Sequence, residues 1–177
     1  MGRKLHIGGQ VRMEGWEVLD ILPGPAVDHL QDARNLAAFA EGTFDQIYAS
    51  HIVEHLDYNE ELLKTLTEWC RVLVPGGLIC ISVPDLDVLA RLFLDRKGLT
   101  VADRHLVMRM IFGGHIDGYD YHLVGLNDEF LYGYLINAGF VDVQRVERFG
   151  IFGDSSELSL KGTLISLNMR ARKPTTA

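Results

Sequence analysis

The sequence predicts an α/β fold, in which a single Rossmann-like domain over residues 1–177 holds a doubly wound, mostly parallel sheet with an antiparallel final strand pair. Two observations support it. Short apolar segments open the chain, and from residue 44 onward segments with helical spacing alternate with segments of strand character. Two segments of alternating apolar and polar residues then close the chain, which favours an open α/β sheet over a barrel or a sandwich.

Three short strands are predicted near the start of the chain, over residues 4–8, 16–21 and 27–30. Only about eight residues separate the first two, whereas a parallel crossover usually takes about a dozen or more and contains a helix. The first crossover helix is therefore predicted to be missing or very short, and an antiparallel hairpin is the alternative. After the third strand, residues 34–40 have room for at most about two turns of helix.

The centre of the chain carries its longest amphipathic pattern. A strand is predicted over residues 44–50, and apolar residues then recur three and four positions apart over 52–73, which indicates one long helix. The Pro-Gly-Gly run at 75–77 is expected to end that helix. The apolar run at 78–83 is typical of a strand that is covered on both faces.

Two helices are expected next, over residues 85–93 and 101–112. Asp85 and Thr100 are their predicted N-caps, because short polar side chains accept hydrogen bonds from the first-turn amides. The segment 113–125 is polar, aromatic and rich in glycine. That composition is typical of a loop that can close over a pocket.

The last part of the chain predicts one more helix and the closing strands. The helix covers residues 127–138 and is followed by Gly139, because glycine readily adopts the left-handed conformation found after many helices. Alternating residues over 141–149 and 163–172 predict the antiparallel pair, with a loop over 150–162 between them.

Composition excludes several classes of partner. The formal net charge is −7, so no global positive field attracts nucleic acid or an anionic membrane, and neither is predicted as a partner. The basic residues between 91 and 109 are interpreted as a solvated helix face. The only cysteines, Cys70 and Cys80, lie among apolar residues and are predicted to be free thiols. No apolar leader is recognised, so the expected location is cytoplasmic.

A His-x-x-Glu-His motif follows the strand at 44–50. His51, Glu54 and His55 match the inverted zincin motif, in which two histidines on a helix bind zinc and the acid between them activates water. On a helix, a spacing of four residues puts both histidines on one face. A zinc hydrolase is therefore a remote alternative, which is disfavoured because such peptidases are larger and the motif here follows directly on a strand.

Short segments along the chain also form an ordered set: LHIGG, VLDI, QDA, FDQIYASHIVEHL, RVLVPGG, VPD, NAGF and SLNMRARK. With this set the chain resembles the class I methyltransferases that use S-adenosyl-L-methionine (SAM), especially a small bacterial branch with a shortened N-terminus. The resemblance covers nearly the whole chain. It implies a Rossmann-like sheet and SAM as the cofactor.

The resemblance implies a set of cofactor-binding residues, namely Gly8, Gly9, Asp20, Asp32, Ala33 and Ser50. The two glycines would approach the amino-acid end of SAM. Asp20 would accept both ribose hydroxyls, because the lone pairs of a carboxylate match a vicinal diol. Asp32 and Ala33 would lie beside the adenine, and Ser50 would form part of the pocket floor near the methyl group.

The candidate catalytic residues are His51, Glu54, His55 and His122. A histidine can take a proton near neutral pH from an acceptor that must lose one, and His51 is the first candidate. The chain also resembles methyltransferases that carry Glu-x-x-Glu-His here and bind a divalent cation. That resemblance implies a cation as a lesser option, with His115 or His122 completing its ligands.

The predicted function is SAM-dependent methyl transfer to a small-molecule or saccharide-linked acceptor. Two departures from the family pattern define the main alternative. Gln10 stands where a third glycine is usual, and the segment that normally covers the cofactor is expected to be absent before the first strand. The alternative is a degenerate binding or regulatory module without catalysis. The more exposed site also leaves room for an oligomer or a protein partner.

Overall fold

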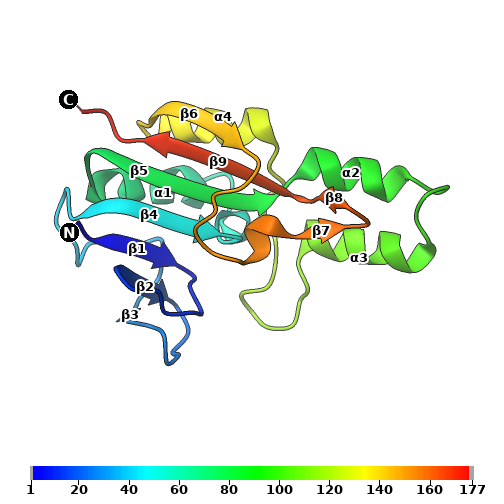
Figure 1. Cartoon of the computed structure of the whole chain (residues 1–177), viewed down its shortest axis with the longest axis horizontal. Helices are drawn as coiled ribbons and strands as arrows, with labels where there is room; N and C mark the ends of the chain where they lie inside the picture. Colours follow the sequence, from blue (N-terminus) through cyan, green and yellow to red (C-terminus); the bar gives the residue numbers. More distant parts are fainter. Residues whose placement is uncertain (1, 176–177) are drawn as a thin grey trace.

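A computed structural model describes residues 2–175, and its centre is a seven-stranded sheet (Figure 1). The strands lie in the order β3-β2-β1-β4-β5-β9-β6. Their bounds are β1 Lys4–Ile7, β2 Trp16–Asp20, β3 His29–Leu30, β4 Phe44–Ser50, β5 Leu73–Pro84, β6 Val141–Val146 and β9 Ser166–Arg172. The pairs from β3 to β5 are parallel, whereas β9 is antiparallel to β5 and β6. The predicted fold class is thereby confirmed.

The connection between β1 and β2 contains no helix. Lys4 pairs with Trp16 in parallel register, which excludes an antiparallel hairpin. Residues 8–15 form a short irregular connection, in which the N–H of Gly8 donates to the carbonyl of Leu19 at 2.8 Å. The prediction that the first crossover helix is missing is confirmed.

The helices are α1 Glu61–Val72, α2 Leu86–Leu94, α3 Val101–Phe112 and α4 Asp128–Asn137, with the 3-10 turns η1 Val53–His55 and η2 Ser155–Glu157. The predicted N-caps are confirmed. Asp85 accepts from two first-turn amides of α2, and Thr100 forms a reciprocal capping box with Asp103 at the start of α3. Asn127 caps α4 by accepting from the N–H of Phe130.

The long helix predicted over 52–73 is wrong in its first part. Only a 3-10 turn forms at Val53–His55, and α1 begins at Glu61. Between them, Oδ1 of Asp57 accepts from the N–H of Asn59 at 2.8 Å, and the N–H of Asp57 donates to Oε2 of Glu61 at 3.1 Å. Such side-chain bonds compete with the hydrogen bonds of a helix, so the chain makes turns where apolar spacing alone predicted helix.

The end of α1 also differs from the prediction. The helix ends at Val72 and β5 starts at Leu73, so the Pro-Gly-Gly run lies inside the span of the strand rather than between helix and strand. Gly76 has a φ of +77°, and the register between β4 and β5 shifts across this run. A glycine with positive φ is typical of such a bulge.

Smaller differences lie at the ends of strands and in loops. β3 has two residues, β6 ends at Val146 instead of residue 149, and residues 34–40 form turns without helix. The loop predicted over 150–162 contains η2 and the first strand of a small hairpin, formed by β7 (Ser159–Leu160) and β8 (Thr163–Leu164).

The two faces of the sheet are covered differently. On one face, α1 and α4 pack on the main core, which includes Ile47 from β4 and Trp69 from α1 (Figure 1). On the other face, Tyr48 and Phe152 belong to a smaller aromatic cluster. The hydroxyl of Tyr48 donates to Asp154 at 2.9 Å, which holds the segment before η2 against the sheet.

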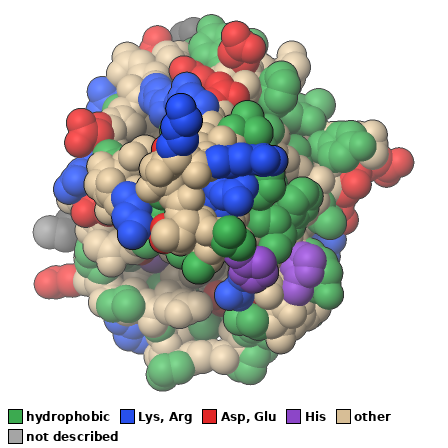
Figure 2. Space-filling view, turned by 90° about the vertical axis from the view of Figure 1, so that its right-hand side faces the viewer, with side chains coloured by type: hydrophobic (Ala, Val, Ile, Leu, Met, Phe, Trp, Pro, Cys, Tyr) green, Lys and Arg blue, Asp and Glu red, His purple; other side chains and the backbone are tan. Residues whose placement is uncertain are grey.

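The end of the molecule beyond β5 is formed by α2, α3 and the β7–β8 hairpin, and Lys and Arg side chains gather on it (Figures 1 and 2). The α2–α3 segment supplies Arg91, Arg96, Lys97, Arg104 and Arg109. None of them forms an ion pair with another residue of the described chain, and all but Arg104 are exposed. This exposure fits the interpretation as a solvated helix face.

Two further predictions concern the cysteines and the membrane. Cys70 and Cys80 are buried free thiols, as predicted. Among residues 2–175, no helix combines the length and the apolar character that crossing a membrane requires.

Glu17 ties the outer parallel strands together, and we expect this link to weaken in acid. Its carboxylate accepts from Arg3 at 2.7 and 2.8 Å and from His29 at 2.8 Å. The Arg3 hydrogen bond, with help from His29, lowers the pKa of Glu17 from 4.5 to about 2. The carboxylate therefore stabilises the fold above about pH 4.5, and this contribution is lost as the pH falls toward 2.

The measurement is urea unfolding of the wild type and Glu17→Gln at pH 7 and pH 3. The carboxylate is partly exposed and solvent screens its ion pair, so we expect a difference of about 1 kcal/mol or less at pH 7, and a smaller one at pH 3. A difference that does not change with pH would contradict the role of the charge.

Candidate active site

A cavity of about 660 Å³ lies at the carboxyl ends of β1 and β2. This volume is in the usual range for small-molecule and cofactor sites, and crevices in open α/β sheets lie at this end of the strands. The wall includes Gly8 after β1, Asp20 at the end of β2, the turn at 32–34 and residues 55–57. Segments far apart in the sequence therefore meet around one space.

Gly8 turns the chain at the base of the cavity. Its φ is +74°, in the left-handed region that glycine adopts without strain. A Cβ atom at this position would overlap the side chain of Ile52, which also lines the cavity. The positive φ therefore favours glycine here, whereas the overlap involves only the end of the flexible Ile52 side chain.

Asp20 presents a carboxylate to the cavity. Its Oδ1 accepts from the N–H of Leu22 at 2.8 Å, which fixes the orientation of the side chain. Its Oδ2 has no hydrogen-bond partner among residues 2–175. The free oxygen is available to a ligand that donates hydrogen bonds.

Asp32 lines the cavity together with an arginine that the sequence did not single out. Arg34 donates to both oxygens of Asp32, the shorter ion-pair distance being 2.6 Å, and its Nη1 lies 2.6 Å from Oε1 of Glu61. The Arg34 hydrogen bonds lower the pKa of Asp32. Arg34 thus places a planar cation in the wall, and only its position two residues after Asp32 could have indicated it.

Ala33 is held in the same wall by a buried tryptophan. Nε1 of Trp69 donates to the carbonyl of Ala33 at 2.8 Å. Trp69 belongs to α1 and is fully buried in the main core, between this helix and the sheet. The position of the 32–34 turn therefore depends on the packing of α1.

Gly9 and Ser50 do not line this cavity. Gly9 is buried against the imidazole of His6, where a Cβ would overlap the ring. Ser50 shares its face of β4 with Tyr48, and its buried Oγ has no hydrogen-bond partner in the described part of the chain. Gly9 contacts His6 and Ser50 shares the face of Tyr48, so both lie on the face of the sheet that carries the aromatic cluster.

His51 points away from the cavity. Its backbone has a φ of +55°, and its Nε2 lies 3.0 Å from Oγ of Ser166 on β9. Its Nδ1 lies 3.3 Å from Oε1 of Glu54. Burial lowers the pKa of His51 to about 4 and raises that of Glu54 to about 8, so both groups tend toward their neutral forms. We therefore interpret this contact as a neutral pair instead of a salt bridge.

Glu54, His55 and His122 form a cluster beside the cavity. One oxygen or nitrogen atom from each lies within 4.8 Å of the others, and the two imidazole centroids are 4.9 Å apart. Nδ1 of His55 donates to the carbonyl of Tyr121 at 3.0 Å, so the lone pair is on Nε2. Burial, and then the neighbouring His55, lower the pKa of His122 to about 4.

The inverted zincin motif is not formed. It requires His51 and His55 on one face of a helix, and this segment has only the 3-10 turn η1. His122, from the loop before α4, instead joins Glu54 and His55. The sequence predicted that His115 or His122 completes a set of metal ligands. It did not distinguish the two, because no local pattern specifies the path of the loop that carries them.

The loop over 113–125 contributes to the cavity wall, as its composition predicted. Tyr119, Tyr121 and Leu123 line the cavity from this side. The N–H of Leu123 donates to the carbonyl of Glu54 at 2.8 Å, which docks the end of the loop beside η1. Figure 2 shows histidine side chains next to hydrophobic ones on this end of the molecule.

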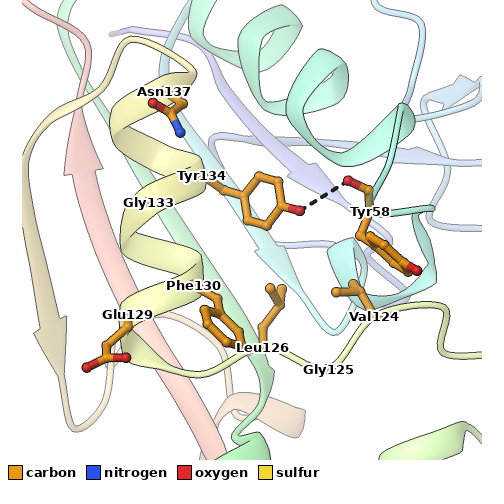
Figure 3. Close-up of a pocket in the computed structure, with 9 residues that line it drawn as sticks. All are labelled: Tyr58, Val124, Gly125, Leu126, Glu129, Phe130, Gly133, Tyr134 and Asn137. Carbon is orange, nitrogen blue, oxygen red and sulfur yellow. Dashed lines mark hydrogen bonds between the residues drawn. The ribbon is translucent and has the colours of Figure 1, made fainter.

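A second, more open hollow of about 470 Å³ lies between α4 and the segment 124–126 (Figure 3). Tyr134 points across it from α4, and its hydroxyl donates to the carbonyl of Tyr58 at 3.1 Å. The hollow is lined mainly by apolar and aromatic groups, and its one charged residue is Glu129. It contains none of the predicted site residues, so the larger cavity is the candidate active site.

The family model of the methyltransferase domain matches residues 21–81, which includes the 32–34 turn, β4, η1 and α1. No curated protein gives a significant match.

Comparison with solved structures identifies the fold. An Archaeoglobus fulgidus SAM-dependent methyltransferase is 19% identical with a TM-score of 0.62, and the match covers 97% of this chain and 86% of that one. The Burkholderia thailandensis 1,6-didemethyltoxoflavin-N1-methyltransferase, solved with 1,6-didemethyltoxoflavin and S-adenosylhomocysteine (SAH), is 18% identical with a TM-score of 0.57, covering 98% and 72%.

A third similar structure is longer than this chain. It is a Bordetella parapertussis protein described as a possible exported protein, 14% identical with a TM-score of 0.61. The match covers 98% of this chain but only 62% of that protein. At these identities the likeness shows the fold, which is the class I methyltransferase fold that the sequence predicted.

Proposed function

From the class I methyltransferase fold and the matched methyltransferase domain, we propose that this protein transfers a methyl group from SAM to a small-molecule or saccharide-linked acceptor. One observation carries the proposal. The cavity at the carboxyl ends of β1 and β2 gathers Gly8, Asp20, Asp32 and Ala33, four of the residues that the sequence assigned to the cofactor.

In this proposal Asp20 binds the ribose. Its free Oδ2 accepts from the ribose hydroxyls, while the bond from Leu22 keeps the carboxylate oriented. At the adenine end, Arg34 donates to both oxygens of Asp32, and its guanidinium offers a flat cationic surface on which a base can stack. Gly9 and Ser50 support the turn and the strand end from behind.

Methyl transfer requires little from the protein beyond alignment of the methyl donor with the acceptor. SAM supplies a methyl group on a sulfonium, which is already a reactive donor. The protein must orient the acceptor toward that methyl group and, for a hydroxyl or amine, receive its proton. Of His51, Glu54, His55 and His122, only His55 lines the cavity. We therefore assign the acceptor side of the site to the cluster of His55, Glu54 and His122.

Other predictions extend this proposal without independent support. The cytoplasmic location remains a prediction. It also remains a prediction that a second copy of the chain, or another protein, covers the open side of the cavity. The absence of a helix between β1 and β2 motivates this prediction.

Calorimetry with SAH tests the proposal. We expect one SAH to bind per chain, and Tyr134→Phe, which alters only the second hollow, to bind it equally well. No heat of binding at millimolar SAH, from protein shown to be folded by circular dichroism, would reject a stand-alone enzyme. That result would favour the non-catalytic binding module.

A further inference from the structure

We propose that Glu54, His55 and His122 bind a Zn²⁺ ion, which fastens the 113–125 loop to the wall of the cavity. The three side chains come from two segments: Glu54 and His55 lie in η1, and His122 lies near the end of the loop. Their potential ligand atoms lie within 4.8 Å of one another. The inference concerns the ion alone and does not depend on methyl transfer.

The buried carboxylate of Glu54 is the first reason. Glu54 is 1% exposed, and among residues 2–175 its one polar side-chain contact is that of Oε1 with Nδ1 of His51 at 3.3 Å, while Oε2 has no partner. Burial of a carboxyl group without a partner costs free energy. A cation placed between Glu54 and the two imidazoles supplies the missing partner.

The orientation of His55 is the second reason. Its Nδ1 donates to the carbonyl of Tyr121, so its Nε2 is the acceptor atom. Histidines that bind metals usually donate their other N–H to a carbonyl or carboxylate in this way. The ring is thus held in the tautomer that a metal requires before any ion is bound.

The kind of ligand atoms favours Zn²⁺ over Mg²⁺. Two imidazole nitrogens and one carboxylate oxygen form a common set for Zn²⁺ with an open fourth position. Mg²⁺ prefers oxygen ligands and keeps several waters, so this set disfavours it. A water or an acceptor hydroxyl can occupy the open fourth position, and one of the three ligands, His55, lines the cavity.

The geometry links metal binding to the loop. Ligand atoms on a tetrahedral Zn²⁺ are about 3.4 Å apart, since each bond is about 2.0–2.1 Å long. The cluster must therefore contract slightly around the ion. His122 is the member on the loop, which also carries Tyr119 and Tyr121 in the cavity wall, so the contraction draws the wall inward.

Two other histidines are excluded by their contacts. Nε2 of His51 is bonded to Oγ of Ser166, and its Nδ1 faces Oε1 of Glu54 at 3.3 Å. His115 stacks on Tyr121 with ring centroids 4.0 Å apart, and its Nε2 donates to the carbonyl of Phe112. Neither ring is free to complete the set.

Zinc titration of untagged, chelator-treated protein tests this inference, without SAM or SAH present. Calorimetry should find one Zn²⁺ per chain, and excess Mg²⁺ should not displace it. His122→Ala and Glu54→Gln should weaken binding at least tenfold. His115→Ala, in the same loop, and His105→Ala, exposed on α3, are the matched controls and should bind as the wild type does.

Hydrogen exchange gives a readout of the loop itself. Zn²⁺ should slow exchange of the amides over 114–121 in the wild type and leave it unchanged in His122→Ala. The inference is overturned if the wild type binds no Zn²⁺, or if folded His122→Ala binds it equally well. Glu54→Gln changes a buried residue and can prevent folding. If Glu54→Gln does not fold, the result for His122→Ala decides between the two outcomes. SAH binding is measured separately, so either proposal can fail alone.

Discussion

Replacement of Trp69 by Ala is expected to lower the free energy of unfolding by about 3–5 kcal/mol, the usual cost of emptying a buried aromatic site. Trp69 is fully buried in the main core, between α1 and the sheet. Its indole N–H also bonds to the carbonyl of Ala33. Urea unfolding followed by far-ultraviolet circular dichroism measures the loss without relying on tryptophan fluorescence.

Two variants separate packing from the hydrogen bond. Trp69→Phe keeps most of the buried volume but leaves the Ala33 carbonyl unpaired, so we expect a loss of about 1–3 kcal/mol and weaker SAH binding. Leu63→Ala alters a partly exposed side chain on the same helix and should cost less than Trp69→Ala. A loss below about 1 kcal/mol in Trp69→Ala would contradict the packing described for α1.

Replacement of Asp20 by Ala is expected to weaken SAH binding about 10- to 100-fold. Hydrogen bonds to a charged group are worth about 1.5–3 kcal/mol, and each 1.4 kcal/mol changes affinity tenfold. Among residues 2–175 the side chain of Asp20 bonds only to the N–H of Leu22, so stability should fall by no more than about 1 kcal/mol. Calorimetry and thermal unfolding separate the two effects.

Asp45→Ala is the control for that experiment. Asp45 lies in β4 near its amino end, whereas the cavity is at the carboxyl ends of the strands, and its removal takes away the same charge. We expect the control to bind SAH as the wild type does. Equal loss of affinity in both variants would assign the effect to net charge, and no loss in Asp20→Ala would refute the ribose assignment.

Several features could be predicted because neighbouring residues determine them. Thr100 and Asp103 form a capping box from residues three apart, and Asp85 caps α2 from the residue before it. The short connection of residues 8–15 leaves no room for a crossover helix. Asp20 ends a short apolar strand, so its place at the carboxyl end of the sheet follows from the length of that strand.

The break in the long central helix shows where such signals fail. The apolar spacing from residue 52 onward is compatible with a helix. Spacing alone does not reveal that Asp57 forms hydrogen bonds with Asn59 and Glu61. These bonds connect residues only two and four apart. They were missed because periodicity reports which face is buried and not which backbone bonds form.

The sequence by itself determined the class of the fold, the order of its elements and the acidic side chains at the strand ends, since these follow from local spacing and short connections. Only the tertiary structure decided that β1 and β2 are parallel, that Arg34 bridges Asp32 and Glu61, and that His122 joins Glu54 and His55 while His51 turns toward Ser166. Each of these depends on contacts between residues distant in the chain. Their partners are fixed by the packing of the whole core, which no local pattern specifies.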